Sequence, residues 1–399
     1  MTAIAAFDDD RAKRAAITLA IAQALSSSAT VILVASAGLV GTMIAPSRAW
    51  ATAPITAFVI GTALTTIPAA LLMKRVGRRP GFMLGAGMGV LAGLIAIYAV
   101  FTRNFVLFCF SAFLQGVPQG FMGYYRFAAA DIASPAFRPR AISWVMTGGV
   151  AAAVFGTLII MVTADLWAPV TYAGTYMAMA ILCALAMVVL SQVDIPLGED
   201  HHAAEPARPL AQIVRNPRTI VAMVTAMLAF GMMNLVMTAT PIAMVDCGFD
   251  KNSAFWVIQW HVLAMYIPSF FTGSLIARYG VERICALGMI ILAASGASAL
   301  LGLSFANFAA GLILLGLGWN FGYVGGTAML TECYRPSERA KVQALNDFAV
   351  AATVAAASLT SGQLFDIMGW NGVITAMFPA VALALGFLAW QRSIRPATI

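Results

Sequence analysis

Long apolar stretches separated by short polar connections dominate the chain. A membrane-spanning helix needs about 20 mostly apolar residues, and the sequence supplies twelve such stretches. We place the break in the uncharged run from Ile284 to Thr331 at Ser304 to Asn307. The pattern predicts an all-α membrane protein with transmembrane helices at residues 15–44, 51–73, 81–102, 105–129, 141–164, 170–193, 219–245, 253–277, 284–303, 306–330, 342–365 and 371–391.

Basic residues alternate from one connection to the next, which predicts the orientation of the chain. All but four of the 23 Lys and Arg residues fall in the two ends and in every second connection. Only Arg48, Arg103 and Lys251 fall in the other connections, and Arg126 lies inside an apolar segment. Because positive charge is retained on the cytoplasmic side, we expect both termini in the cytoplasm and the protein in the plasma membrane, which is the inner membrane of a bacterium.

Composition narrows the class of protein further. The chain is 61% hydrophobic and only 10% charged, whereas soluble domains are about 25% charged. The net charge of +7 comes from residues that flank helices, where topology and lipid headgroups explain it, so we expect no nucleic-acid partner. The five cysteines are scattered singly and predict neither a disulfide framework nor a metal site.

One long polar stretch near the middle divides the chain into two halves. We predict a cytoplasmic tail at residues 1–13, a six-helix bundle at 14–195, a cytoplasmic linker at 196–216 and a second six-helix bundle at 217–396. His201 and His202 are adjacent in this linker without further ligands, which favours a solvated loop over a metal site.

The two halves repeat each other. Residues 131–140 match residues 332–341 at the acidic, proline and basic positions. Residues 70–79 match residues 273–282 at a leucine, an arginine and a glycine, again between the second and third helices of each half. Duplicated halves are typical of secondary transporters.

At these residues the chain resembles the major facilitator superfamily, and the resemblance covers nearly its whole length. The family pattern between helices two and three is Gly-x-Leu-x-Asp-Arg-x-Gly-Arg-Arg, and here it reads Ala70-x-Leu72-x-Lys74-Arg75-x-Gly77-Arg78-Arg79. Two positions depart from it, since Ala70 replaces the first glycine and Lys74 replaces the aspartate. The Gly-Pro signature of family exporters in the fifth helix is also absent, and Gly148 to Gly156 fit close helix packing instead.

The replaced aspartate suggests a charge-swapped contact. In the family this aspartate helps to hold the two halves together against the start of the eleventh helix. That helix carries Asp347, the one acidic residue well inside an apolar segment. We expect either a cytoplasmic latch between Lys74 and Asp347 or, alternatively, a Lys74 that extends to the headgroups. The resemblance implies a cytoplasmic gate formed by Lys74, Arg75, Gly77, Arg78, Asp131, Arg138, Glu332 and Arg339.

The resemblance also implies that the first, fourth, seventh and tenth helices line a central cavity. Amide and aromatic side chains on these helices suit a flat organic solute, although Trp and Tyr also gather at membrane interfaces. Gln115, Gln119 and Gly123 recur every four residues and predict one polar face. The candidate substrate-binding residues are Gln23, Gln115, Gln119, Tyr124, Arg126, Asn234, Trp319, Asn320 and Tyr323.

Arg126 is the leading candidate because intramembrane charges are costly and usually functional. Its planar guanidinium suits a carboxylate or phosphate, which predicts an anionic substrate. Equally, Arg126 lies five residues before Asp131 and fits a structural gate residue paired with an acid. His261 and Asp347 are candidates for proton coupling, although a lone buried histidine more often serves packing.

These observations predict a secondary active transporter that moves a small organic solute, anionic or aromatic, by alternating access. The nucleotide-binding pattern Gly-x-x-x-x-Gly-Lys-[Ser/Thr] is absent, so we expect proton coupling and no cofactor. A membrane-embedded enzyme is disfavoured because no nucleophile and base or metal-ligand set is readable. The alternatives are a broad-specificity drug or metabolite exporter and, more remotely, a non-transporting sensor. We expect a monomer; import and export stay open.

Overall fold

A computed structural model describes residues 9–134, 137–195 and 208–394. All regular structure in these residues is helical. Most of the predicted linker, with His201 and His202, lies outside the described residues. The chain divides into two compact units, unit 1 with residues 1–40 and 57–200, and unit 2 with residues 41–56 and 201–399. The predicted bundle limits, 14–195 and 217–396, stay predictions.

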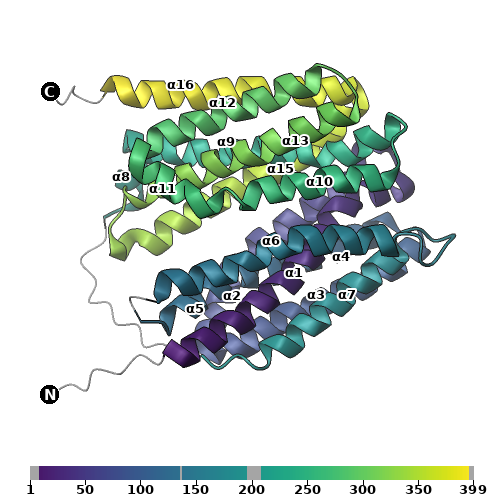
Figure 1. The fold of residues 1–399 in the computed structure, drawn as a ribbon, viewed down its shortest axis with the longest axis horizontal. Coiled ribbons are helices and arrows are strands. Elements are labelled where there is room, and N and C mark those ends of the chain that lie inside the picture. Colours follow the sequence, from purple (N-terminus) through teal and green to yellow (C-terminus); the bar gives the residue numbers. More distant parts are fainter. Residues whose placement is uncertain (1–8, 135–136, 196–207, 395–399) are drawn as a thin grey trace. The chain divides into compact units, whose positions relative to one another are not determined.

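Unit 1 consists of long helices that lie side by side (Figure 1). Helix α3 packs against both α4 and α7, and α5 packs against α6. The first helix begins at Asp9, so part of the predicted tail is helical. The helices are α1 (Asp9–Ile44), α2 (Ala53–Val76), α3 (Arg78–Phe101), α4 (Phe105–Met122), α5 (Tyr125–Asp131), α6 (Arg138–Thr163) and α7 (Ala173–Leu190).

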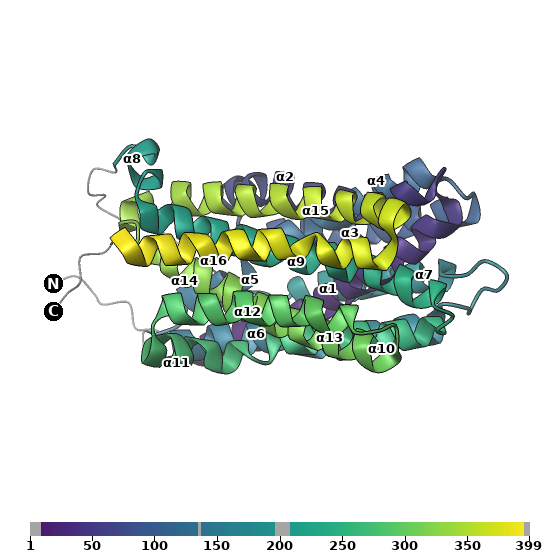
Figure 2. The ribbon, with the colours of Figure 1, turned by 90° about the horizontal axis from the view of Figure 1, so that it is seen from above.

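Unit 2 repeats this build, with α15 packed along α9 (Figure 2). Helix α12 packs against α13 and α16, and α10 packs against α13. The helices are α8 (Leu210–Val214), α9 (Pro217–Asp246), α10 (Lys251–Tyr266), α11 (Ser269–Tyr279), α12 (Val281–Leu300), α13 (Phe305–Trp319), α14 (Gly325–Thr331), α15 (Arg339–Thr375) and α16 (Met377–Ile394), with short turns η1 (Arg48–Trp50), η2 (Asn320–Val324) and η3 (Pro336–Glu338).

The number of membrane spans agrees with the sequence pattern. Among the described residues, 10 helical stretches are long and apolar enough to cross a membrane, and α10 with α11, bent by 42°, makes an eleventh. The last stretch, Lys341–Ser393, is 53 residues long, which is well over twice the length of about 20 residues that a bilayer needs. Gly369, with a φ of 66°, breaks it. Counted as two spans, it completes the predicted twelve.

Two predicted helices are interrupted. The fourth span, expected to be continuous over 105–129, breaks between α4 and α5 at Gly123 and Tyr124. The tenth span continues from α13 into α14 through η2, a π-helical turn. Such turns are rare and often mark functional positions. Each interruption lies in the fourth helix of its unit.

Glycine at matching positions starts the third helix of each unit. Gly77 precedes α3 with a φ of 93°, and Gly280 precedes α12 with a φ of 87°. Residues with a side chain rarely adopt this backbone region. The sequence repeat therefore corresponds to the same local turn in both units.

Small residues let α1 and α6 approach closely within unit 1. A Cβ on Gly148 would lie 2.6 Å from the Ala20 carbonyl oxygen, and one on Gly156 would lie 2.8 Å from the Val31 side chain. The structure confirms the packing role expected for these glycines, because close backbone approach compensates for the weak hydrophobic drive between helices in lipid.

Candidate functional site

A seam of amides and hydroxyls runs between α1 and α4 in unit 1. The Gln23 Nε2 donates a 3.0 Å hydrogen bond to the Ser27 Oγ. The Thr30 Oγ1 donates a 3.1 Å hydrogen bond to the Gln119 Oε1. The Gln23 bond lies within α1, whereas the Thr30–Gln119 bond joins α1 to α4. Both amide side chains are only partly buried.

Gln115 does not share this seam. Its side chain is buried, and its Nε2 contacts the Cys183 Sγ on α7 at 3.9 Å. The Gln115 Oε1 has no hydrogen-bond partner in the described part of the chain. The two glutamines predicted to share one polar face therefore contact different neighbouring helices.

The interruption between α4 and α5 positions Tyr124 and Arg126. The Tyr124 hydroxyl donates a 2.9 Å hydrogen bond to the Thr66 carbonyl oxygen on α2. Arg126 is exposed, and its guanidinium carbon lies 4.9 Å from the centre of the Phe127 ring. Asp131, the acid considered for Arg126, forms an ion pair with Arg78. Arg126 stays a predicted substrate-binding or gate residue.

An aromatic cluster lies in the core of unit 2. The Trp319 and Tyr323 rings stack with centres 5.3 Å apart and an angle of 17° between their planes. The Phe230 ring meets both edge-on, at 5.4 Å from Trp319 and 5.0 Å from Tyr323. The Trp319 Nε1 is buried and has no partner among the described residues. Buried donors normally find an acceptor, so this N–H is a polar group that the described part of the chain leaves unsatisfied.

Asn320 lies beside this cluster and faces the break between α10 and α11. Its side chain is fully buried. The Nδ2 donates to the Met265 carbonyl oxygen at 2.7 Å and to the Ser269 Oγ at 2.6 Å. The Oδ1 accepts from the Thr272 Oγ1 at 2.6 Å. Asn320 therefore satisfies backbone and side-chain groups freed by the bend, which gives it a positioning role next to the stacked rings.

The other predicted intramembrane residues of unit 2 contact neighbouring helices. The Asn234 Nδ2 donates to the Val354 carbonyl oxygen at 3.4 Å, joining α9 to α15. The fully buried His261 has its Nδ1 2.8 Å from the Leu312 carbonyl oxygen. Asp347 is exposed and accepts a 3.2 Å hydrogen bond from Asn346. Proton coupling through His261 or Asp347 and the Lys74–Asp347 latch stay predictions.

The predicted gate residues lie at the ends of the helices. Arg78 pairs with Asp131 in unit 1, and Arg218 pairs with Glu332 in unit 2. Lys74, Arg75 and Arg339 are exposed, and the side chain of Arg138 lies outside the described ones. The sequence repeat identified Asp131 and Glu332 but not Arg218, since no motif links the first residues of α9 to a loop 114 residues later.

The sequence pattern also did not predict a second ion pair, which joins Arg208 and Glu338. The Glu338 carboxylate accepts hydrogen bonds from the Arg208 side chain at 2.8 and 2.7 Å, from the Arg208 backbone N–H at 2.9 Å and from the Arg335 backbone N–H at 2.9 Å. The hydrogen bonds from the Arg208 side chain hold the pKa of Glu338 well below its ordinary value. This pair ties the chain just before α8 to the turn before α15.

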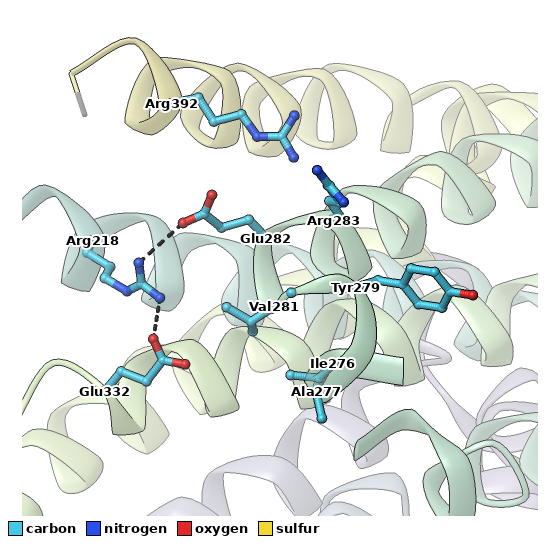
Figure 3. Close-up of a pocket in the computed structure, with 10 residues that line it drawn as sticks. Arg218, Ile276, Ala277, Tyr279, Val281, Glu282, Arg283, Glu332 and Arg392 are labelled. Carbon is cyan, nitrogen blue, oxygen red and sulfur yellow. Dashed lines mark hydrogen bonds and ion pairs between the residues drawn. The ribbon is translucent and has the colours of Figure 1, made fainter. Parts of the chain in front are cut away.

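Charged side chains also line a pocket of about 790 Å³ at one end of unit 2. Arg218 bridges the carboxylates of Glu282 and Glu332, with 3.2 Å between its Nη1 and the Glu282 Oε1. Figure 3 shows Arg283 and Arg392 pointing toward each other across the pocket, while the Tyr279 ring points away. The pocket is therefore lined by three arginines and two glutamates.

One family model matches nearly the whole chain. The model of the Major Facilitator Superfamily matches residues 15–259 and 221–398. The chain belongs to the Major Facilitator Superfamily. It is a multi-pass integral membrane protein and a secondary transporter of a small molecule, as the sequence predicted.

Individual relatives include transporters with different substrates. The riboflavin transporter RfnT of Brucella anthropi is 43% identical over 380 residues, which cover 95% of this chain and 96% of RfnT. The drug efflux pump JefA of Mycobacterium tuberculosis is 26% identical over 159 residues, covering 39% of this chain and 30% of JefA. The crystal structure of the nucleoside transporter NupG shares the fold, with a TM-score of 0.70 at 12% identity, covering 94% of this chain and 99% of NupG.

Proposed function

We propose that this transporter moves riboflavin, or a closely similar flavin, across the bacterial inner membrane by alternating access. The observation that carries the proposal is the 43% identity to RfnT along nearly the whole of both chains. The match to the drug efflux pump covers only 39% of this chain, so a broad-specificity exporter is the second candidate.

The chemistry of riboflavin suits candidate side chains within unit 2 and, considered separately, within unit 1. Its three-ring isoalloxazine is flat, aromatic and uncharged at neutral pH, with carbonyl oxygens and one N–H along an edge, and its ribityl chain carries hydroxyls. The stacked Trp319 and Tyr323 offer aromatic faces, and the unpaired Trp319 Nε1 offers a donor for a carbonyl oxygen. Gln23 and Gln119 in unit 1 supply groups that can bind hydroxyls.

An uncharged substrate changes the expected part of Arg126. A guanidinium can donate hydrogen bonds to carbonyl oxygens without neutralising a charge. Under this proposal the loss of Arg126 weakens riboflavin transport without abolishing it. An organic-anion carrier would instead lose transport entirely, because a carboxylate would enter the membrane interior without a counter-charge.

Riboflavin uptake by a bacterium that neither makes nor imports the vitamin tests the proposal. We expect expression of this chain to restore growth at limiting riboflavin and to give saturable uptake. Trp319→Ala removes a stacking partner worth about 1 kcal/mol, so we expect KM to rise severalfold. Trp260→Leu is the matched control, since Trp260 lies on α10 of the same unit with half of its surface exposed, and it should transport normally.

The same cells distinguish a riboflavin transporter from a broad-specificity exporter. Equal protection against several unrelated drugs, with no riboflavin uptake, would favour the exporter and overturn the proposal. Collapse of the proton gradient by an ionophore tests coupling. If a gradient drives uptake, the initial rate should fall several-fold, and His261→Gln and Asp347→Asn then ask which of the two residues carries the dependence.

A further inference from the structure

We propose that the pocket lined by Arg218, Arg283 and Arg392 binds a phosphate group, either in the headgroup of an acidic phospholipid or as a free phosphate. This goes beyond transport of a flavin, because the pocket lies at the end of unit 2, lined by the start of α9, the α11–α12 turn, the end of α14 and the end of α16.

In the described part of the chain, the carboxylates of the pocket pair with only one of its three arginines, Arg218. Arg218 bonds both Glu282 and Glu332, and Gln391 donates a further 3.0 Å hydrogen bond to Glu282. Among the described residues, no ion pair involves Arg283 or Arg392. Two exposed guanidinium groups from different helices therefore point toward each other (Figure 3), an arrangement that an anion between them would stabilise.

The backbone at the start of α12 also favours an anion in this pocket. Gly280 lines the pocket with a φ of 87°, and α12 begins directly after it. The first backbone N–H groups of a helix have no partners within the helix, and the helix dipole favours negative charge there. Arg283 lies in this first turn, so its side chain and the free N–H groups can reach one oxyanion. Phosphate, with several acceptor oxygens, suits this set of donors.

The surroundings resemble a headgroup site. The pocket lies at the helix ends, where headgroups are found, and arginine pockets between membrane helices bind acidic lipids. Beyond it, α12 presents the exposed side chains of Leu287 and Ile290, and α16 presents that of Trp390. An acyl chain could lie along these apolar side chains while its phosphate stays between the arginines.

The test compares wild type with Arg283→Gln/Arg392→Gln in detergent. Thermal unfolding is followed with added phosphatidylglycerol, with added phosphatidylcholine, and with sodium phosphate against sodium chloride at equal ionic strength. Ligand that binds the folded state raises the apparent unfolding temperature. We expect phosphatidylglycerol, but not phosphatidylcholine, to raise it for wild type, with an apparent affinity at least about tenfold lower in the double variant.

Arg278→Gln is the matched control, because Arg278 lies near the same end of unit 2 and rests over the Tyr279 ring; it should respond like wild type. If sodium phosphate alone gives the arginine-dependent shift, the ligand is a soluble phosphate. Equal responses of wild type and double variant, or no response to either phosphate source, would overturn the proposal. Should the double variant fail to fold, Arg392→Gln alone, at an exposed helix end, carries the test. No arm uses riboflavin, so the result is independent of the transport proposal.

Discussion

The matching ends of the two units form similar charge networks with the signs exchanged. In unit 1 the start of α1 supplies a carboxylate, since Asp9 accepts hydrogen bonds from Ser134 at 2.9 and 3.0 Å, and the start of α3 supplies the cation Arg78, which pairs with Asp131. In unit 2 the start of α9 supplies the cation Arg218, and the start of α12 supplies the carboxylate Glu282.

The carboxylates of the two charge networks are paired with cations in different ways. Asp131 pairs with Arg78, whereas a single cation, Arg218, pairs with both Glu282 and Glu332. A repeat can therefore keep the positions of its acidic loop residues while the partner comes from a different helix. Among the described residues, no ion pair involves Arg283 or Arg392 of unit 2, the two arginines for which we propose a phosphate ligand.

The interrupted fourth helices differ in a related way. When Asp131 is aligned with Glu332 in the sequence, Gln119 aligns with Asn320. Gln119 accepts one hydrogen bond from Thr30 on the first helix of its unit, while Asn320 makes three hydrogen bonds around the α10–α11 bend. The same amide position thus joins a partly buried seam in unit 1 and stabilises a buried helix break in unit 2.

Replacing these two amides should give the largest difference between the units. Asn320→Ala removes three hydrogen bonds. The Thr272 hydroxyl keeps the Pro268 carbonyl oxygen as acceptor, but the Met265 carbonyl oxygen loses this partner, and a buried group left unsatisfied costs about 1–3 kcal/mol, so we expect a loss of about 2–3 kcal/mol. Gln119→Ala should cost about 1 kcal/mol or less. Unfolding in mixed detergent measures both, and equal losses would contradict the different roles.

Removing the central cations should give the next largest difference. Arg218→Gln leaves two neighbouring carboxylates without their shared cation, and we expect a loss of about 1–2 kcal/mol, reduced from the cost for a buried pair because Glu332 is half exposed. Arg78→Gln removes a single exposed pair and should cost below about 1 kcal/mol. Unfolding in the same mixed detergent measures both variants.

Adding Glu332→Gln to Arg218→Gln should restore part of that stability, because it removes one of the two carboxylates that lose Arg218 as their cation. In unit 1, the corresponding change is the addition of Asp131→Gln to Arg78→Gln. If the second change in unit 2 destabilises further, Arg218 is not the shared partner of both carboxylates.

When Asp131 is aligned with Glu332, Glu338 aligns with Phe137, and the two side chains make different contacts. Phe137 meets Trp144 edge-on at 5.3 Å, whereas Glu338 binds Arg208. Because the pKa of Glu338 is lowered in the folded protein, its contribution is present above the ordinary glutamate pKa and is lost as pH falls toward the folded pKa.

We therefore expect Glu338→Gln to lower the unfolding temperature by a similar amount at pH 6 and pH 8. The difference from wild type should shrink progressively below about pH 4.5. Phe137→Leu serves as the control, since its effect involves no titrating group and should not change with pH in this way. A constant difference for Glu338→Gln down to the lowest pH would show that the carboxylate charge is not what stabilises this turn.

The features that the sequence predicted depend on short-range patterns. Apolar length predicted the spans, and repeated motifs identified Gly77 with Gly280 and Asp131 with Glu332. The break at Gly123 and Tyr124 and the π-turn at Asn320 were missed, because no local signal separates them from a continuous apolar helix. Arg208 with Glu338 was missed because 130 residues separate the partners.

The smallest expected difference between the units tests whether the repeat is equal where both units carry the same glycine. Gly77→Ala and Gly280→Ala place a Cβ on backbone with φ values of 93° and 87° and ψ values of 163° and 145°, where a side chain costs about 1–3 kcal/mol. Neither Cβ would meet an atom closer than the 3.8 Å to Pro80 at Gly77, so the cost is conformational and should be the same in both units. Gly386→Ala, on α16 with open space around its Cβ, should be neutral or slightly stabilising. A loss at Gly280 well above that at Gly77 would mean that the turn in unit 2 carries an added role, which the adjacent arginine pocket would supply.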